Sequence, residues 1–422
     1  MLELSKIREN PQEIIKKLAI KNLNASENVA LILQLDEKRR QLQKENDTCL
    51  AAQNKMAAEI GTAMKAGKKE EAEQLKEKNA TLKETTKKHQ SELEIIENLL
   101  QDELVKLPNL PSEKVSPGKS AADNDIIHTV TALPKLTTKI PHWELCAKYN
   151  LIDFETGVKL TGAGFPVYRG KGARLQRALI NFFLDKAVAA GYLEVQPPIL
   201  VNHDSGFGTG QLPDKEGQMY FVSEDQLYLI PTAEVPVTNI YRNTILKESD
   251  FPQKLTAYTP CFRREAGSYG KDVRGLNRLH QFDKVEIVRI EHPENSYKVL
   301  EEMKDYVCSL LEQLELPYRV LKLCGGDMSF ASALTYDLEV FSAAQEKWLE
   351  VSSVSNFESF QSNRLKLRFK GNDGKTQLAH TLNGSALALP RIVAALLENN
   401  YNGHYIHIPK AIQHYTGFDR ID

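Results

Sequence analysis

Two segments of this chain combine arginine, carboxylate and aromatic side chains at spacings suited to nucleotide chemistry. The first, Thr259 to Ile290, reads TPCFRREAGSYGKDVRGLNRLHQFDKVEIVRI and predicts a β-hairpin with a long glycine-rich loop. The second, Leu382 to Asn400, reads LNGSALALPRIVAALLENN and predicts a strand, an Asn-Gly-Ser turn and an apolar helix with Arg391 in its first turns. Two arginines, an aromatic ring and several carboxylates on one sheet suit a nucleoside triphosphate and a substrate that carries a cation.

The hairpin would present Arg263 and Glu265 on one face, because strand residues two apart point to the same side. Phe282 would return to this site on the partner strand. Either Arg263 or Arg391 alone would suit a structural ion pair. The spaced set of residues favours a binding site instead.

The elements that must position these residues begin only after Trp143. All 15 Tyr, 15 Phe and 2 Trp lie at or beyond that position, and a globular core without aromatics is not expected over so long a stretch. Leu35, Leu42, Cys49 and Met56 instead recur every seven residues, and a second heptad row follows Gly61 and Gly67. The sequence therefore predicts two helices of roughly 35–40 residues, joined at a glycine-containing turn as an antiparallel coiled coil.

This helical arm could be a dimerisation element or spacer, or it could bind RNA. Basic side chains that could follow a phosphate backbone are Arg39, Arg40, Lys44, Lys55 and Lys65. They could equally form a solvated face balanced by nearby glutamates. The arm alone does not decide between these alternatives.

The expected domain organisation is a helical domain at 1–110, with its coiled coil at about 27–106, a Pro- and Ser-containing linker at 111–135, and a second domain at 136–422. In the second domain, a long amphipathic helix from Arg174 to Gly191 precedes an extended run entered through two prolines. The later strands look like hairpins, and few helices alternate with them. We therefore expect an α+β fold with a central antiparallel sheet flanked by helices, rather than a doubly wound sheet.

Composition narrows the class of protein. The formal net charge of −2 gives no general sign of nucleic-acid binding, so an RNA site must come from local patches. The five cysteines are scattered without a CxxC motif, which favours a reducing compartment and argues against zinc. We expect a cytoplasmic protein without a secretory leader or membrane span, because no run approaches the ~18 apolar residues that a span needs.

Four motifs follow one another in a specific series: TAE at 232–234, FRREAGSYGKDVRGLNRLHQFDKVE from Phe262, EVSS at 350–353 and NGS at 383–385. Together they resemble the class II aminoacyl-tRNA synthetases, and in detail the seryl-tRNA synthetase family of the zinc-free type. The resemblance covers nearly the whole chain. Arg264, Ala386 and Pro390 depart from the family pattern, in which Ser, Gly and Gly are expected. None of these departures removes a group that the reaction needs.

The resemblance implies a role for each motif residue. Arg263 would clamp the α-phosphate and the serine carboxylate, Glu265 would accept from the adenine amino group, and Phe282 would stack on adenine. The implied serine-binding set is Thr232, Ala233, Glu234, Arg263, Glu286, Asn383 and Ser385. The implied ATP-binding set is Arg263, Arg264, Glu265, Leu279, Phe282, Glu350, Val351, Ser352, Ser353 and Arg391. Taken by itself, Thr232 would also suit a helix N-cap.

The resemblance also implies that Glu350 and Ser353 hold Mg²⁺ with ATP. Hard oxygen ligands suit this ion. Strict strand alternation would place residues 350 and 353 on opposite faces, so a bulge or a strand end is required there.

The implied activity is that of a homodimeric ligase that activates L-serine with ATP and transfers it to tRNA(Ser), and also to tRNA(Sec). One alternative is a related ligase that loads a small amino acid onto a carrier protein, although such relatives typically lack a tRNA-binding arm. A second is a regulatory paralogue without activity. That alternative predicts losses at one or more of five residues, all of which the sequence retains: Arg263, Glu265, Glu286, Glu350 and Arg391.

Overall fold

The computed structural model describes residues 1–130, 132–134, 136, 138–214, 216–265 and 274–422. Within these ranges the chain forms two compact units. One contains Leu2–Ala19 and Leu23–Pro108, and the other contains Met1, Ile20–Asn22 and Asn109–Asp422. Most of the glycine-rich loop expected in the hairpin falls on residues 266–273, outside the described residues.

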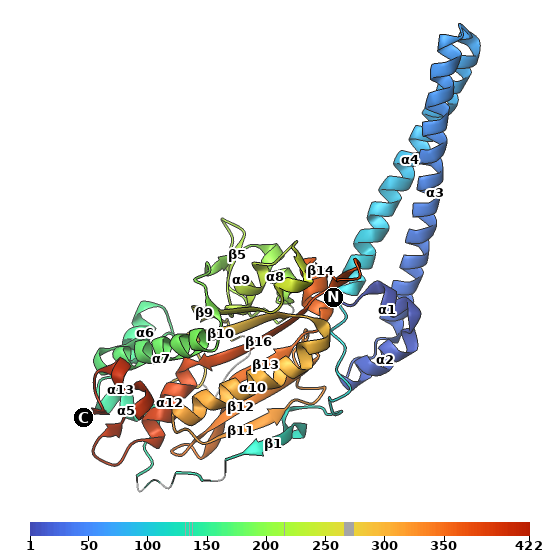
Figure 1. Cartoon of the computed structure of the whole chain (residues 1–422). Helices are drawn as coiled ribbons and strands as arrows, with labels where there is room; N and C mark the ends of the chain where they lie inside the picture. The colour runs from blue at the N-terminus through green and yellow to red at the C-terminus, as the bar shows by residue number, and fades with distance from the viewer. Residues whose placement is uncertain (131, 135, 137, 215, 266–273) are drawn as a thin grey trace. The chain divides into compact units, whose positions relative to one another are not determined.

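The regular elements of the first unit are all helices, joined by short turns and connections. Its helices are α1 (Leu4–Glu9), α2 (Pro11–Ile20), α3 (Ser26–Lys65) and α4 (Lys69–Leu104). Helices α3 and α4 run side by side in opposite directions (Figure 1), and the turn between them places Gly67 at φ +75°, a conformation that favours glycine. The two long helices predicted from the heptads are confirmed.

The seam between α3 and α4 mixes apolar and polar side chains. Leu42 and Leu100 are buried there, and so are Asn46 and Thr86. Gln53 of α3 donates a 3.0 Å hydrogen bond to the backbone carbonyl of Leu82 in α4. Such polar contacts fix the register of two helices more strictly than leucines alone would.

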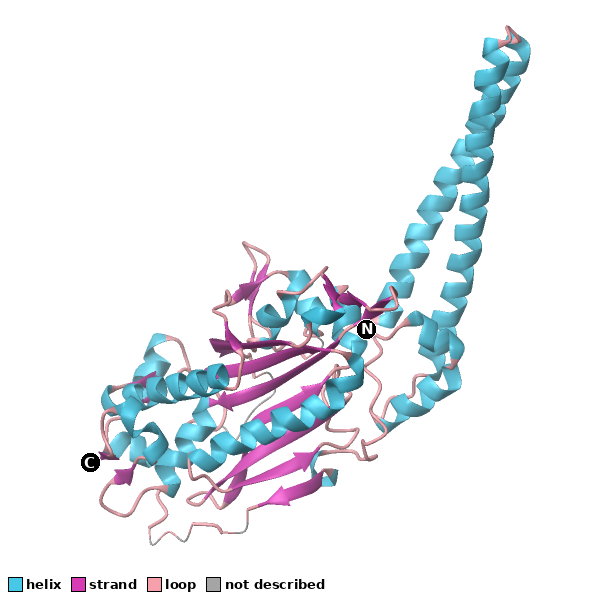
Figure 2. Ribbon diagram, in the orientation of Figure 1, coloured by secondary structure: helices cyan, strands magenta, loops and turns pink. Residues whose placement is uncertain are grey.

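In the second unit, strands of the described residues form an eight-stranded sheet in the order β1-β11-β12-β13-β16-β10-β9-β4. All neighbouring pairs are antiparallel except β4 with β9. Figure 2 shows the strands in magenta and the helices that accompany them in cyan. The strands are β1 (Asp125–Thr129), β4 (Leu193–Glu194), β9 (Gln253–Phe262), β10 (Gln281–Glu291), β11 (Tyr318–Lys322), β12 (Leu334–Ser342), β13 (Lys347–Asn356) and β16 (His380–Ala388). Strand β1 forms within the stretch expected to be a linker and pairs with β11.

The central strands are buried on both faces, so they lack the alternation of a half-exposed strand. In β10, Val285 and Ile287 join the main core cluster, whereas Val288 and Ile290 join a second cluster. The main cluster includes side chains of α7 (Gly170–Ala189), α10 (Ser296–Gln313) and α12 (Leu389–Asn399). The second includes side chains of α9 (Glu234–Asn239) and α11 (Ser359–Leu365). The α+β fold with a largely antiparallel sheet flanked by helices is confirmed.

Shorter elements surround this sheet. The remaining helices are α5 (His142–Lys148), α6 (Phe154–Leu160), α8 (His203–Thr209) and α13 (Lys410–Thr416). The remaining strands are β2 (Ile152–Asp153), β3 (Val167–Tyr168), β5 (Leu200–Val201), β6 (Phe221–Val222), β7 (Leu227–Leu229), β8 (Ile245–Lys247), β14 (Arg368–Lys370), β15 (Thr376–Leu378), β17 (Ile406–His407) and β18 (Arg420–Ile421). Across the described residues, we find no helix with the length and apolar character needed to cross a membrane.

Candidate active site

Arg263 lies where strand β9 ends, and it joins two parts of the site. Its guanidinium lies over the ring of Phe282 at 5.2 Å, and its Nε donates a 3.4 Å hydrogen bond to the carbonyl of Pro231. The register explains the first contact, because Phe262 at the end of β9 pairs with Gln281 at the start of β10. Arg263 therefore connects the aromatic residue of the hairpin to the segment that precedes Thr232.

The residues after Arg263 leave the strand. Glu265 has a φ of +50°, so strand alternation does not set its direction, and it forms an ion pair with Arg278 on the returning side of the hairpin. Arg264 is exposed, with its guanidinium 6.0 Å from the ring of Tyr220. Leu279 is buried in the main core cluster.

Arg391 meets Glu350 at the other end of the site. The first turn of α12 contains Pro390, which suits the start of a helix. One terminal nitrogen of Arg391 donates a 2.7 Å hydrogen bond to the backbone carbonyl of Glu350 and lies 3.9 Å from its carboxylate. Its Nε donates to the carbonyl of Asn277 at 3.0 Å. These bonds fix the direction of the guanidinium and leave it about one-third exposed.

The bulge required in β13 is confirmed. Ser352 pairs with Leu338 and Glu350 with Glu339, so Val351 is the additional residue on its strand. This brings residues 350 and 353 to the same side, where the Ser353 hydroxyl donates to the Glu350 carboxylate at 3.4 Å.

Asp337 is a third oxygen-bearing side chain at this place, and sequence reasoning missed it. It pairs with Ser353 across β12 and β13 and is 9% exposed. Burial, followed by the charge of Glu350, raises the pKa of Asp337. The side chains of Glu350 and Ser353 supply hard oxygen ligands, which fit Mg²⁺. Among the described residues, no cluster of three or more His, Cys, Asp or Glu side chains that could hold a metal ion is found.

A second, enclosed polar group lies around Thr232 and Glu286. The Thr232 hydroxyl donates to the Glu286 carboxylate at 3.4 Å and accepts from the ammonium of Lys284 at 2.7 Å. Lys284 and Glu286 also form a 2.5 Å ion pair, with side chains only 6% and 2% exposed. The Thr232 hydroxyl also accepts from the backbone N–H of Glu234, the first residue of α9, at 3.2 Å, although the N-cap position of that helix is Ala233.

Glu234 faces the same group from α9. Burial raises the pKa of its carboxyl to about 7, with a smaller contribution from the charge of Glu286. Its carboxylate accepts a 2.6 Å hydrogen bond from the side-chain amide of Gln361 in α11, and the amide of Asn383 also contacts it. Gln361 and Lys284 were not predicted. Lys284 could have been found, because it lies two residues before Glu286 on one strand and so on the same face.

The Asn-Gly-Ser motif completes this group from strand β16. Ser385 pairs with Glu286 and Asn383 pairs with Val288 across β10 and β16. Asn383 and Ser385 are both 8% exposed. Ser352 donates a 2.6 Å hydrogen bond to the carbonyl of Ser385, which links this polar group to the bulged strand. Residues from three motifs therefore meet on the central strands.

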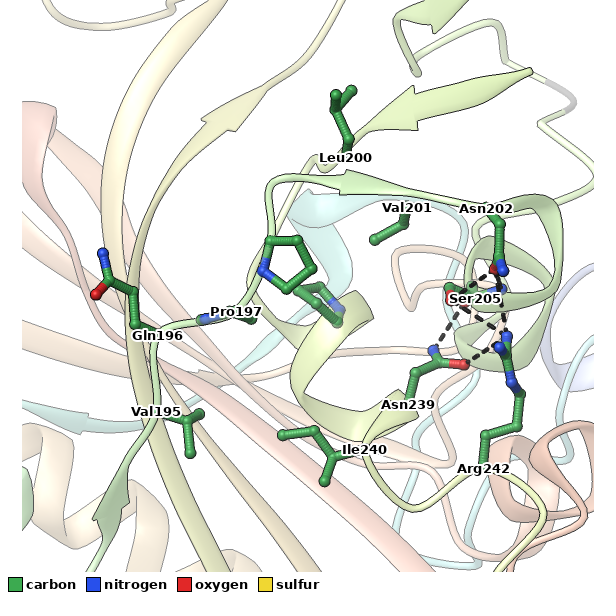
Figure 3. Close-up of a pocket in the computed structure, with 12 residues that line it drawn as sticks. Val195, Gln196, Pro197, Leu200, Val201, Asn202, Ser205, Asn239, Ile240 and Arg242 are labelled. Atoms are coloured by element: carbon green, nitrogen blue, oxygen red, sulfur yellow. Dashed lines mark hydrogen bonds between the residues drawn. The ribbon is translucent and has the colours of Figure 1, made fainter. Parts of the chain in front are cut away.

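A separate cavity of about 490 Å³ lies beside α8 and α9 (Figure 3). It is lined by the extended run that contains Pro197 and Pro198 and by polar side chains that form hydrogen bonds with one another. In one of these bonds, the side-chain amide oxygen of Asn239 accepts from the guanidinium of Arg242 at 3.4 Å. None of its twelve lining residues belongs to the predicted site. We therefore assign the site to the central strands and not to this cavity.

The predicted RNA-contacting residues all lie on α3. Lys44, Lys55 and Lys65 are exposed. Arg39 and Arg40 contact the buried carboxylate of Asp36 at 3.0 and 3.2 Å.

Arg8 contacts the same carboxylate at 3.1 Å. Burial raises the pKa of Asp36, but the hydrogen bonds from Arg39 and Arg8 outweigh it and hold the pKa below its usual value. Three guanidinium groups thus share one carboxylate, which leaves a local positive charge.

Comparison with known proteins covers both units. Residues 220–400 match the tRNA synthetase class II core domain (G, H, P, S and T), and residues 1–111 match the seryl-tRNA synthetase N-terminal domain. The serine–tRNA ligase of Salinibacter ruber is 49% identical, with coverage of 100% of this chain and 99% of the relative. That of Akkermansia muciniphila is 44% identical at the same coverage. The crystal structure of seryl-tRNA synthetase from Pyrococcus horikoshii complexed with ATP superposes with a TM-score of 0.90 and 33% identity, covering 100% of this chain and 99% of that one.

Proposed function

The chain belongs to the seryl-tRNA synthetase family and is a serine–tRNA ligase; from this premise we propose that it works in two steps through a seryl-adenylate. A serine carboxylate oxygen attacks the α-phosphorus of ATP, the bond from that phosphorus to the β-phosphate oxygen breaks, and pyrophosphate leaves. A ribose hydroxyl of the 3′-terminal adenosine of tRNA(Ser) then attacks the seryl carbonyl carbon, and AMP leaves.

The observation that carries this proposal is the position of Arg263. It lies over Phe282, the proposed adenine platform, and it bonds to Pro231, next to the proposed serine pocket. The barrier to the first step is largely repulsion between the serine carboxylate and the α-phosphate. A fixed guanidinium at this junction can bind both anions in a bidentate manner, which lysine cannot do.

The polar group around Glu286 suits the serine side chain and ammonium. Glu234 and Glu286 can together supply two negative charges, and the buried ammonium of Lys284 offsets one of them. One negative charge therefore remains for the substrate ammonium. Thr232, Asn383 and Ser385 supply partners for a hydroxyl, and a pocket built to hydrogen-bond a hydroxyl disfavours alanine, which lacks one.

A different group of residues would bind the triphosphate of ATP. Arg391 would hold the terminal phosphates, with its direction fixed by Asn277 and by the backbone of Glu350. Glu350 and Ser353 would hold Mg²⁺, which when bound offsets part of the negative charge of ATP.

The helical arm would contact the tRNA through its exposed lysines and the arginine cluster at Asp36, reading shape and backbone more than base edges. We propose that the enzyme acts in the cytoplasm as a homodimer and that it also charges tRNA(Sec). The crystal structure of A. aeolicus tRNASec in complex with M. kandleri SerRS shares the fold at a TM-score of 0.59, although it is only 18% identical.

The first experiment is ATP–pyrophosphate exchange with each of the twenty amino acids and Mg²⁺, in the absence of tRNA. Exchange that depends on serine alone supports the proposed adenylate. Exchange with a different small amino acid would point to a carrier-loading ligase. No exchange from folded protein would rule out an adenylate formed without tRNA.

A further inference from the structure

His142 is fully buried at the start of α5 and connects two distant parts of the second unit. Its backbone N–H and its Nδ1 lie 2.9 and 2.7 Å from the same carboxylate oxygen of Glu398. Its Nε2 lies 2.8 Å from the backbone nitrogen of Leu276. An amide N–H can only donate, so Nε2 must carry a lone pair, and the ring proton lies on Nδ1 and is donated to Glu398. The contacts thus fix one neutral tautomer.

Glu398 is itself held in place. Besides the two bonds from His142, its carboxylate accepts from the Ser342 hydroxyl and, at 2.9 Å, from the side-chain amide of Gln345. Glu398 lies in the last turn of α12, and Arg391 lies in the first turn of the same helix. A buried carboxylate with four donors is a rigid anchor, because any movement would leave a charged group unpaired.

The other partner of His142 belongs to the segment 274–277, which leads back into strand β10. Gly275 in this segment has a φ of +67°, and a Cβ there would lie 2.3 Å from the His142 Nε2, so the backbone approaches the ring as closely as glycine allows. The guanidinium of Arg274 lies 5.0 Å from the ring of Trp143. This segment is therefore docked on the first residues of α5.

The docked segment reaches the proposed triphosphate site through its next residue. Asn277 donates a 3.0 Å hydrogen bond from its side chain to Gln345, and its backbone carbonyl accepts the Nε of Arg391 at 3.0 Å. A continuous path of hydrogen bonds and backbone thus runs from Glu398 through His142 and Leu276 to the guanidinium of Arg391.

We propose that His142 is a positioning residue for ATP binding. Through the Leu276 N–H it sets the place of the Asn277 carbonyl, and that carbonyl directs Arg391 toward the triphosphate. The inference rests on the proposed function, in which Arg391 holds the terminal phosphates. If His142 only stabilised the core, its substitution would lower the stability of the protein and would change the affinities for ATP and for serine to the same extent.

Two substitutions separate the two hydrogen bonds of the ring. His142→Gln places an acceptor near the position of Nε2 and keeps the bond to Leu276. His142→Asn places a donor near the position of Nδ1 and keeps only the bond to Glu398. Binding of ATP and of serine would be measured separately by calorimetry, with His203→Asn, at an exposed histidine, as the control. We expect His142→Asn to weaken ATP binding about 5- to 20-fold and His142→Gln less than about threefold, with serine affinity unchanged in both.

A double-mutant cycle tests whether the effect passes through Arg391. Arg391→Ala should weaken ATP binding, and adding His142→Asn to it should change little more. Hydrogen exchange of a peptide covering 274–277 should be faster in His142→Asn and near normal in His142→Gln. If His142→Asn does not fold, Gly275→Ala disturbs the same contact from the loop side and must reproduce the loss of ATP affinity.

The possible outcomes separate a failure of the role proposed for His142 from a failure of the role proposed for Arg391. If Arg391→Ala does not affect ATP binding, the proposed role of Arg391 fails. If Arg391→Ala weakens ATP binding but His142→Asn and Gly275→Ala do not, only the role of His142 is overturned. Equal losses of ATP and serine affinity, or full additivity with Arg391→Ala, would also overturn it.

Discussion

The side-chain amide of Gln361 donates a 2.6 Å hydrogen bond to the carboxylate of Glu234. Gln361 is itself held on two further sides, because it donates to the carbonyl of Thr209 at 3.1 Å and accepts from the hydroxyl of Thr381 at 2.7 Å. All of these groups are buried. A carboxylate of the proposed serine pocket is therefore aimed by a side chain from α11, a helix that carries none of the recognised motifs.

Replacing Gln361 with methionine keeps the volume of the side chain and removes its hydrogen bonds. We expect Gln361→Met to raise KM for serine about tenfold, since a bond to a charged group contributes ~1.5–3 kcal/mol, and to leave KM for ATP within about twofold. Pyrophosphate exchange measures both constants. Gln313→Met is the matched control, because the side chain of Gln313 donates along its own helix α10 to the carbonyl of Ser309 and Gln313 is not part of the proposed serine pocket. A parallel rise in both KM values would contradict a role in the serine pocket.

Serine binding should depend on pH through Glu234. The carboxyl has a pKa of about 7, raised mainly by burial. Below that pH it is neutral and cannot pair with the substrate ammonium, so serine affinity should fall as the pH decreases, approaching about tenfold per pH unit well below the pKa. Calorimetric titration between about pH 5.5 and 8 would measure this dependence, and Glu234→Gln should remove it. A flat profile in the unsubstituted enzyme would count against the assignment.

The raised pKa of Glu234 affects the stability of the folded protein in the opposite direction: serine affinity should fall at lower pH, whereas stability should rise. Because the folded-state pKa lies above the ordinary value of 4.5, the folded protein holds this proton more tightly than the unfolded chain. The stabilisation is fully present below about pH 4.5 and is lost as the pH rises through about 7. In denaturant unfolding of the free enzyme, the free energy of unfolding should therefore decrease less over that pH interval in Glu234→Gln than in the unsubstituted protein.

Because of the bulge at Val351, the adjacent residues Ser352 and Ser353 form hydrogen bonds to different parts of the site. The Ser353 hydroxyl bonds to Glu350, whereas the Ser352 hydroxyl donates to the carbonyl of Ser385. We expect Ser353→Ala to raise the Mg²⁺ concentration needed for half-maximal ATP binding about 3- to 10-fold, with serine affinity unchanged. Ser352→Ala should leave the Mg²⁺ dependence alone and weaken serine binding. Manganese paramagnetic resonance would report the metal directly, and identical spectra for Ser353→Ala and the parent would refute the assignment.

The fold and the bulge in β13 could be predicted from the sequence, because both follow from local patterns of residues. Heptads predict the arm, and the need to bring Glu350 and Ser353 to one side predicts the bulge, which the structure confirms. Sequence reasoning missed Gln361 and His142, because their partners are far away in sequence and no local pattern marks them. It also extended strand alternation to Glu265, although the strand ends at Phe262 and Glu265 turns to a positive φ.

Removing the arm should separate the two half-reactions. We expect deletion of roughly residues 27–106 to leave serine-dependent pyrophosphate exchange within about twofold, because the proposed serine- and ATP-binding residues all lie in the second unit. Aminoacylation of tRNA(Ser) should fall by at least about 100-fold, since phosphate contacts supply much of the affinity for nucleic acid. Loss of exchange in a deletion variant that remains folded would contradict this division of labour.

The ion pair of Lys284 and Glu286 combines binding with stability. Glu286→Ala should raise KM for serine at least about tenfold and affect ATP much less. Because the Lys284 ammonium would then be buried without its partner, the free energy of unfolding should also fall by ~3–5 kcal/mol. Adding Lys284→Met should restore much of that stability, because the unpaired charge is gone, without restoring the use of serine. As a surface control, Asp125→Ala removes the more exposed pair with Lys322 and the hydrogen bond from Ser116, and it should lower the free energy of unfolding much less. If the double variant regained serine-dependent exchange, Glu286 would matter for folding and not for the substrate.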